Sequence, residues 1–168
     1  LEGVGGTVTD KQRRLLRILA EESERLIRLV NSLLDLSKME EGMMTYNLEP
    51  ASLASVIHRA VTEIGPLAEA KRIKIEAKVA KQMPLVKMDH DRILQAVRNL
   101  VGNAVKFTPE GGRVTLSAEQ NNGSVQVWVT DTGPGITAED LPMIFDKYRQ
   151  GNSSSSYMLR GTGLGLPI

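Results

Sequence analysis

The first forty residues carry an apolar stripe with helical spacing. Leucines recur at alternating four- and three-residue steps, and Glu22 fills the one gap in the series. Thr9 or Asp10 can cap the start, and neither Gly nor Pro occurs between this cap and Gly42, which predicts one helix of about 30 residues. A lone helix cannot bury such a stripe on itself, so we expect partner helices and a homodimer formed through this helix. The stripe comprises Leu15, Leu19, Leu26, Leu29, Leu33 and Leu36, and it is widened by Leu16, Ile27, Val30 and Leu34.

After Gly42 the pattern changes to shorter elements, in which helical spacing and strict alternation follow one another. Pro66 should bend or divide the helix that contains it. In order, we expect a helix capped by Ser52 and running to about Ala70, a strand over 73–79, a short strand over 85–88, and a helix capped by Asp89 and running to about Phe107.

Two strands with alternating apolar residues are expected over 114–118 and 125–129. The Asn-Asn-Gly sequence at 121–123 is a hairpin signal between them. A short helix is expected after Thr137. Residues 150–160, with four consecutive serines and no apolar periodicity, are expected to form a mobile loop.

Composition sets limits on the function. The chain has 168 residues with 21 basic and 20 acidic side chains, so its charge gives no reason to expect nucleic acid or a membrane as partner. It has no Cys and only His58 and His90, which excludes disulfides, thiolate chemistry and a His-rich metal site. No apolar run approaches the roughly 20 residues of a membrane span, and no signal peptide opens the chain, so we expect a cytoplasmic location. We interpret the start at Leu1 and the end at Ile168 as those of a fragment.

The helix expected to end at Phe107 carries the first candidate site. Asn99, Asn103 and Lys106 share one of its faces at i, i+4 and i+7. A single Asn in a helix is best explained as part of a solvated polar face. Because Asn is a poor helix former, two Asn residues on one face of the same helix indicate a further role. Together these residues can offer amide oxygens to a hard cation and an ammonium to phosphate. The opposite, apolar face is expected to comprise Ile93, Val97, Leu100 and Ala104.

Two motifs rich in glycine follow. Asp131-Thr-Gly-Pro-Gly-Ile136 comes directly after a strand, where glycines let the backbone approach a ligand and the Asp can accept from an exocyclic amine. An ordinary hairpin turn explains this motif about as well. Gly161-Thr-Gly-Leu-Gly165 can hold phosphate oxygens with successive N–H groups. It is not a dinucleotide-binding fingerprint, because it lacks both the G-x-G-x-x-G spacing and the preceding early strand.

In this order, the three motifs resemble the N, G1 and G2 boxes of the sensor histidine kinases of two-component systems. Residues 144–149 are similar to the F box of that family, and residues 25–39 are similar to the second helix of its dimerisation and phosphotransfer hairpin. The resemblance implies an α+β fold in which the long N-terminal helix of a dimeric helical bundle precedes a Bergerat-type α/β sandwich, a mixed sheet with helices on one face. It also implies a partial hairpin over 1–45 and an ATP-binding catalytic domain over 46–168, truncated at its C-terminus.

The resemblance further implies ATP and Mg²⁺ as ligands and gives roles to particular residues. Asn103 would hold Mg²⁺ through its amide oxygen, Asn99 would line the same site, and Lys106 would meet a phosphate. Phe107 would border the nucleotide, and Asp131 would accept from the adenine amino group. The other nucleotide-binding positions implied are Gly133, Gly135, Ile136, Phe145, Gly161, Thr162, Gly163, Leu164 and Gly165. The residues implied to offset charge on the γ-phosphate are Lys147, Arg149 and Arg160.

Asn99 helps to choose among relatives that share this ATP fold. Gyrase, Hsp90 and mismatch-repair ATPases carry a water-activating Glu four residues before the Mg²⁺ Asn, and an Asn cannot take a proton from water. The resemblance therefore implies transfer of the γ-phosphoryl group to a histidine and then to a response-regulator aspartate. Neither His58 nor His90 has the sequence context of that acceptor, so the acceptor is expected outside this chain.

Two alternatives stay open beside the kinase. One is a non-catalytic module that binds nucleotide or only dimerises, and the other is a related ATP-hydrolysing enzyme. Under the leading interpretation the expected partners are a second copy of the chain, a response-regulator receiver domain and ATP. Nucleic acid is not expected, and a membrane is expected only through upstream segments.

Overall fold

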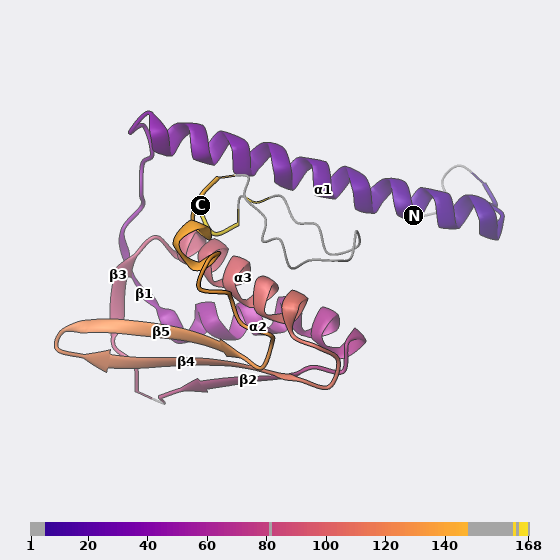
Figure 1. Ribbon diagram of the computed structural model, residues 1–168. Helices are drawn as coiled ribbons and strands as arrows, with labels where there is room; N and C mark the ends of the chain where they lie inside the picture. Colours follow the sequence, from indigo (N-terminus) through magenta and orange to yellow (C-terminus); the bar gives the residue numbers. More distant parts are fainter. Residues whose placement is uncertain (1–5, 81, 148–162, 164, 168) are drawn as a thin grey trace. The chain divides into compact units, whose positions relative to one another are not determined.

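The computed structural model describes residues 6–80, 82–147, 163 and 165–167. The chain divides into two compact units, residues 1–44 and 45–168. The first unit contributes one long helix and the second a layered α/β structure, which confirms the predicted α+β class (Figure 1). The predictions for the loop at 150–160 and for Arg149, Arg160, Gly161, Thr162 and Leu164 lie outside the described residues.

Helix α1 spans Asp10–Glu40, as the apolar stripe predicts. Thr9 caps it: the Thr9 hydroxyl accepts from the Gln12 N–H at 3.3 Å, and the Gln12 side chain accepts from the Thr9 N–H at 2.9 Å. Gly42, at φ +65°, follows its end. Leu19 and Leu26 remain 62% and 61% exposed, so α1 leaves its apolar stripe available to a partner.

The described residues of the second unit form two α-helices and two small sheets. Strands β2 and β4 pair in parallel and β4 and β5 pair antiparallel, giving a mixed sheet in the order β2-β4-β5, while β1 and β3 form a separate antiparallel ribbon. The elements are β1 (Glu49–Ser52), α2 (Leu53–Ala70), β2 (Lys74–Val79), β3 (Leu85–Met88), α3 (His90–Phe107), β4 (Arg113–Asn121), β5 (Ser124–Asp131) and a 3₁₀ turn (Leu141–Met143).

The core lies between the helices and one face of the mixed sheet (Figure 1). Side chains alternate along β4, so that Val114, Leu116 and Ala118 point to the helices and are buried. Burying a side chain of this size contributes roughly 1.5–3 kcal/mol, which makes this layer the main source of stability for the unit. The helical residues of the core are Leu53, Val56, Ile57, Ala60 and Ala68 from α2 and Leu94, Val97, Val101, Ala104 and Val105 from α3.

The structure corrects three details of the sequence analysis. Strand β1 was not predicted, because it contains Pro50, which has no N–H for a ladder hydrogen bond. Pro66 lies inside an uninterrupted α2 and does not divide it. Leu100 was assigned to the apolar face of α3, but it is 42% exposed, because the buried stripe runs instead through Leu94 and Val101 and Leu100 lies at its edge.

Candidate nucleotide-binding site

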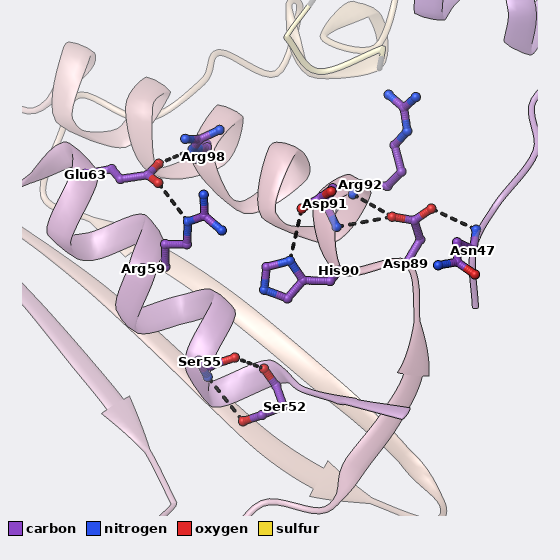
Figure 2. A network of polar contacts seen from close by, with 10 residues as sticks. All are labelled: Asn47, Ser52, Ser55, Arg59, Glu63, Asp89, His90, Asp91, Arg92 and Arg98. Carbon is purple, nitrogen blue, oxygen red and sulfur yellow. Dashed lines mark hydrogen bonds and ion pairs between the residues drawn. The ribbon is translucent and has the colours of Figure 1, made fainter. Parts of the chain in front are cut away.

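Helix α3 carries the first group of candidate residues, and Asp89 fixes where this helix starts. One carboxylate oxygen of Asp89 accepts from the N–H groups of Asp91 and Arg92, at 3.2 and 3.1 Å (Figure 2). The other oxygen accepts from the N–H of Asn47 at 3.0 Å. The hydrogen bond from Arg92, followed by that from Asn47, holds the pKa of the Asp89 carboxyl below its usual value. Asp89 therefore ties the segment before β1 to the first turn of α3.

A second tie joins α3 to α2. Glu63 of α2 accepts from Arg98 of α3 and, at 3.0 Å, from Arg59 one turn earlier on α2 (Figure 2). The hydrogen bond from Arg98 is the largest cause of the lowered pKa of Glu63. The two helices are thus joined by an ion pair as well as by the apolar core.

The polar face of α3 presents the predicted residues as the sequence spacing requires. Asn99, Asn103 and Lys106 are half-buried and Phe107 is exposed. The Lys106 ammonium lies 4.8 Å from the centre of the Phe107 ring, within range of a cation–π interaction. Burial lowers the pKa of Lys106. Partial desolvation strengthens the attraction of this cation for an anionic ligand.

The Asp131–Gly135 loop folds against the end of α3. The Asp131 carboxylate accepts from the Gly133 N–H at 2.7 Å through one oxygen. A Cβ added at Gly133 would lie 2.7 Å from that same oxygen and 3.3 Å from the carbonyl oxygen of Phe107. Gly135 adopts φ +74°, a conformation that side chains disfavour. Glycine is therefore needed here for a close approach between the loop and α3.

Thr132 and Gly112 support this loop, and the sequence analysis did not single them out. The Thr132 hydroxyl accepts from the Arg113 N–H at 2.9 Å, which fixes the loop to the start of β4. A Cβ at Gly112 would lie 2.4 Å from the Thr108 methyl carbon and 2.8 Å from the Thr132 hydroxyl. Only Gly111 of this turn has positive φ, so the second glycine is needed for close packing and not for its backbone angle. The Gly-Gly pair at 111–112 is the sequence signal that could have indicated this close packing.

The third motif reaches α3 through its last glycine. A Cβ added at Gly165 would lie 3.8 Å from Cγ of Asn99, so the backbone of Gly165 passes beside this amide. Gly163 adopts φ +71°. Ile136 and Phe145 are 55% and 65% exposed, which leaves two apolar side chains available to a ligand.

The structure therefore brings parts of all three motifs to one helix. Phe107 lies against the Asp131–Gly135 loop, and Asn99 lies beside Gly165. Lys147 is exposed in the segment after the 3₁₀ turn. Among the described residues no group of three or more His, Cys, Asp or Glu side chains could hold a metal ion. Any cation at the site would need oxygen ligands from amides and from the ligand itself.

A separate hollow of about 530 Å³ opens beside the first turn of α3. It is lined by residues from 45–51 and 88–95, and none of the predicted nucleotide-binding residues is among them. Asp89, one of the carboxylates that line it, already accepts three backbone hydrogen bonds. The hollow thus belongs to the helix start and not to the candidate site.

Comparison with known proteins identifies the two units. Residues 88–168 match the family described as "Histidine kinase-, DNA gyrase B-, and HSP90-like ATPase". Residues 2–42 match the "His Kinase A (phospho-acceptor) domain". No helix among the described residues is both long and apolar enough to span a bilayer.

Similar proteins align with nearly the whole chain. Hybrid signal transduction histidine kinase D of Dictyostelium discoideum is 35% identical over 93% of this chain, and cell-division control histidine kinase PdhS of Brucella anthropi is 34% identical over 99%. The chain spans 10% and 17% of their lengths. The crystal structure of full-length ShkA in complex with AMPPNP superimposes with a TM-score of 0.80 at 31% identity, covering 97% of this chain and 34% of that one.

The fold and the site define an ATPase domain of the type shared by histidine kinases, gyrase B and HSP90. With the phospho-acceptor family matched beside it, the chain belongs to the sensor histidine kinases of two-component systems. The resemblance stated from the motifs is thereby confirmed.

Proposed function

We propose that the chain binds Mg²⁺·ATP on the polar face of α3 and transfers the γ-phosphoryl group to a histidine of the intact protein. The observation that carries the proposal is the convergence of three motifs on α3, through Phe107 with Gly133 and Asn99 with Gly165. Residues 46–168 would form the catalytic domain, and residues 1–45 would belong to the dimerisation and phosphotransfer hairpin. The AMPPNP bound in the ShkA structure supports a nucleotide as the ligand.

Asp131 would recognise adenine. One of its carboxylate oxygens is engaged by the Gly133 N–H, which fixes the side chain. The second oxygen can accept a hydrogen bond from the exocyclic amine of adenine, a group that guanine lacks at the same ring position. Phe107, Ile136 and Phe145 would supply apolar contact to the ring system, because all three are exposed.

Lys106 and Asn103 would bind the phosphates. The partly desolvated Lys106 ammonium is suited to a phosphate oxygen. Mg²⁺ fits this donor set, since it is usually held by few protein oxygens together with nucleotide phosphates and water, and the Asn103 amide oxygen is one such ligand. When bound, it would offset charge on the phosphates. Gly161, Thr162, Gly163, Leu164 and Gly165 would approach the phosphates, with Lys147, Arg149 and Arg160 offsetting charge on the γ-phosphate.

Asn99 would direct the chemistry toward transfer. An amide cannot accept a proton from water, so this position provides no general base for hydrolysis. The transfer would then depend on positioning an imidazole nitrogen in line with the γ-phosphorus. The histidine would come from the helical hairpin, and a response-regulator aspartate would receive the phosphoryl group next. The exposed stripe of α1 supports a homodimer as the assembly that presents the acceptor.

Calorimetry of ADP and AMPPNP binding to the full chain, with and without Mg²⁺, tests the nucleotide site. We expect saturable binding that Asp131→Asn weakens by at least tenfold and that loses its Mg²⁺ dependence in Asn103→Ala. Asp91→Asn, whose side chain is 89% exposed at the start of α3, and Asn121→Ala, at the end of β4, are matched controls that should bind as the wild type does. Failure of the folded wild-type chain to bind either nucleotide would contradict the proposal.

Phosphoryl transfer is tested in the intact protein that contains this chain. Labelled γ-phosphate should appear in an acid-labile, base-stable protein adduct, as expected for phosphohistidine. Steady phosphate release without an adduct would instead favour an ATP-hydrolysing enzyme.

A further inference from the structure

Lys71 makes an unusual set of hydrogen bonds to the end of α3. Its ammonium donates to the carbonyl oxygens of Val105, Lys106 and Thr108, at 2.7, 2.8 and 2.8 Å. An ammonium has three N–H donors, so these carbonyls use all of them. The side chain is half-buried, and it comes from the other helix of the layer.

The end of α3 needs these donors because Pro109 comes two residues after its last residue. The last four carbonyls of a helix have no partner within the helix. The Ala104 carbonyl accepts from the Thr108 N–H at 2.9 Å, but the next donor along the chain would be residue 109, which is a proline and has no N–H. The Val105 carbonyl would therefore lack a donor, and Lys71 supplies it.

The position of Lys71 is itself well fixed. Lys71 is the C-cap residue of α2, whose own end is closed by hydrogen bonds from the Arg72 and Ile73 N–H groups to the carbonyls of Glu69 and Ala68. The ends of α2 and α3 thus meet at this ammonium. Each helix C-terminus carries partial negative charge, so a cation is favoured between them.

We propose that Lys71 is a positioning residue for the nucleotide site. Its three hydrogen bonds fix the last turn of α3, from which Lys106 and Phe107 project, and the backbone that leads into the turn at 109–112. The Phe107 carbonyl in the same turn is where the Gly133 backbone approaches. One ammonium therefore sets the spacing between the phosphate-binding and adenine-binding sides. The expected effect of Lys71 on nucleotide affinity rests on the nucleotide site proposed above. Its expected effect on the backbone of 104–112 does not depend on that site.

Hydrogen exchange of the nucleotide-free full chain tests the backbone effect. Lys71→Met keeps the length of the side chain and removes the ammonium. We expect at least tenfold faster exchange at amides of 104–112, with exchange in the first turns of α2 unchanged. Lys78→Met is the matched control, since Lys78 is 67% exposed on β2, and it should leave 104–112 at the wild-type rate. Wild-type exchange at 104–112 in Lys71→Met would overturn the proposal.

Calorimetry tests the consequence for ligand. Removing an outer-shell partner of a metal ligand typically costs 10- to 100-fold in affinity. We expect a comparable effect from a residue that orients nucleotide-binding groups, so Lys71→Met should weaken ADP binding by about tenfold or more. Lys71→Arg keeps the charge and should retain part of the affinity. If Lys71→Met does not fold, Lys71→Gln replaces it in both measurements. Unchanged ADP affinity in the Met or Gln variant would overturn the positioning role. If the wild-type chain binds no nucleotide, the proposed function fails, and exchange at 104–112 alone decides whether Lys71 holds the turn.

Discussion

The backbone N–H of Ile73 donates to the carbonyl oxygen of Ala68 at 2.8 Å and closes the end of α2 over Arg72. Ile73 and Ala68 are both buried, as the hydrophobic contact of such a helix end requires. Arg72 occupies the left-handed position between them at φ +54°, where glycine is the usual residue.

Replacing Arg72 with glycine should therefore stabilise the chain. The left-handed conformation costs a residue with a side chain roughly 1 kcal/mol or more, and glycine removes that strain. The ion pair between Arg72 and Glu110 is lost, but its side chains are 82% and 66% exposed and such pairs contribute little. We expect thermal denaturation of Arg72→Gly to shift upward by about 2–4 °C. Gly111→Ala, at φ +77° in open space, is the reverse control and should lower the midpoint.

Glycines 112 and 102 should respond in opposite directions to alanine. At Gly112 the added Cβ meets the methyl carbon of buried Thr108 at 2.4 Å, so Gly112→Ala should destabilise by about 1–3 kcal/mol. At Gly102 nothing lies within 4 Å, and alanine inside α3 should stabilise by roughly 0.5–1 kcal/mol. Urea denaturation of both variants measures the difference. Equal effects would show that the close packing around Gly112 is absent in solution.

Asp89 should make the stability of the folded chain depend on pH. Because the folded-state pKa is lowered, the carboxylate stabilises the fold above its ordinary value of about 4, and this contribution is lost as pH falls through the lowered value. Asp89→Asn should lower the denaturation midpoint at pH 7 and flatten its decline below pH 4. Denaturation curves between pH 2 and pH 7 test this. A variant as stable as the wild type at pH 7 would mean that the negative charge of Asp89, to which the Asn47 and Arg92 N–H groups are hydrogen-bonded, contributes nothing to stability.

The apolar stripe of α1 should mediate self-association. Leu26→Glu places a charge on the stripe, where the wild-type side chain is 61% exposed, and should convert a dimer to a monomer in sedimentation velocity. Arg28→Glu, on the charged face and with its side chain 69% exposed, is the control and should remain dimeric. A wild-type chain that sediments as a monomer at high concentration would contradict dimerisation through α1 alone.

Much of this architecture was predictable because its signals are local. Ser52 and Asp89 were predicted as caps from their position before a periodic run, and each caps its helix. For the first helix the sequence left Thr9 and Asp10 open, and Thr9 is the cap. Contacts between distant segments carried no such signal. The pairing of β1 with β3 depends on a partner far along the chain, and Lys71 looks like any surface lysine until α3 is placed beside it. The motif residues were recognisable by type and spacing, but only the fold puts Asn99 next to Gly165.

The parallel pairing of β2 with β4 has a consequence for the order of folding. Everything between Val79 and Arg113, including α3, must be arranged before Ile75 can lie opposite Val114, whereas β4 and β5 need only a tight turn. Hairpins form within microseconds, while contacts that close long loops come later and slow the whole process. The helix that bears the nucleotide site lies inside that late-closing loop. Recovery of ligand binding during refolding should thus follow the slowest structural phase and not the earliest.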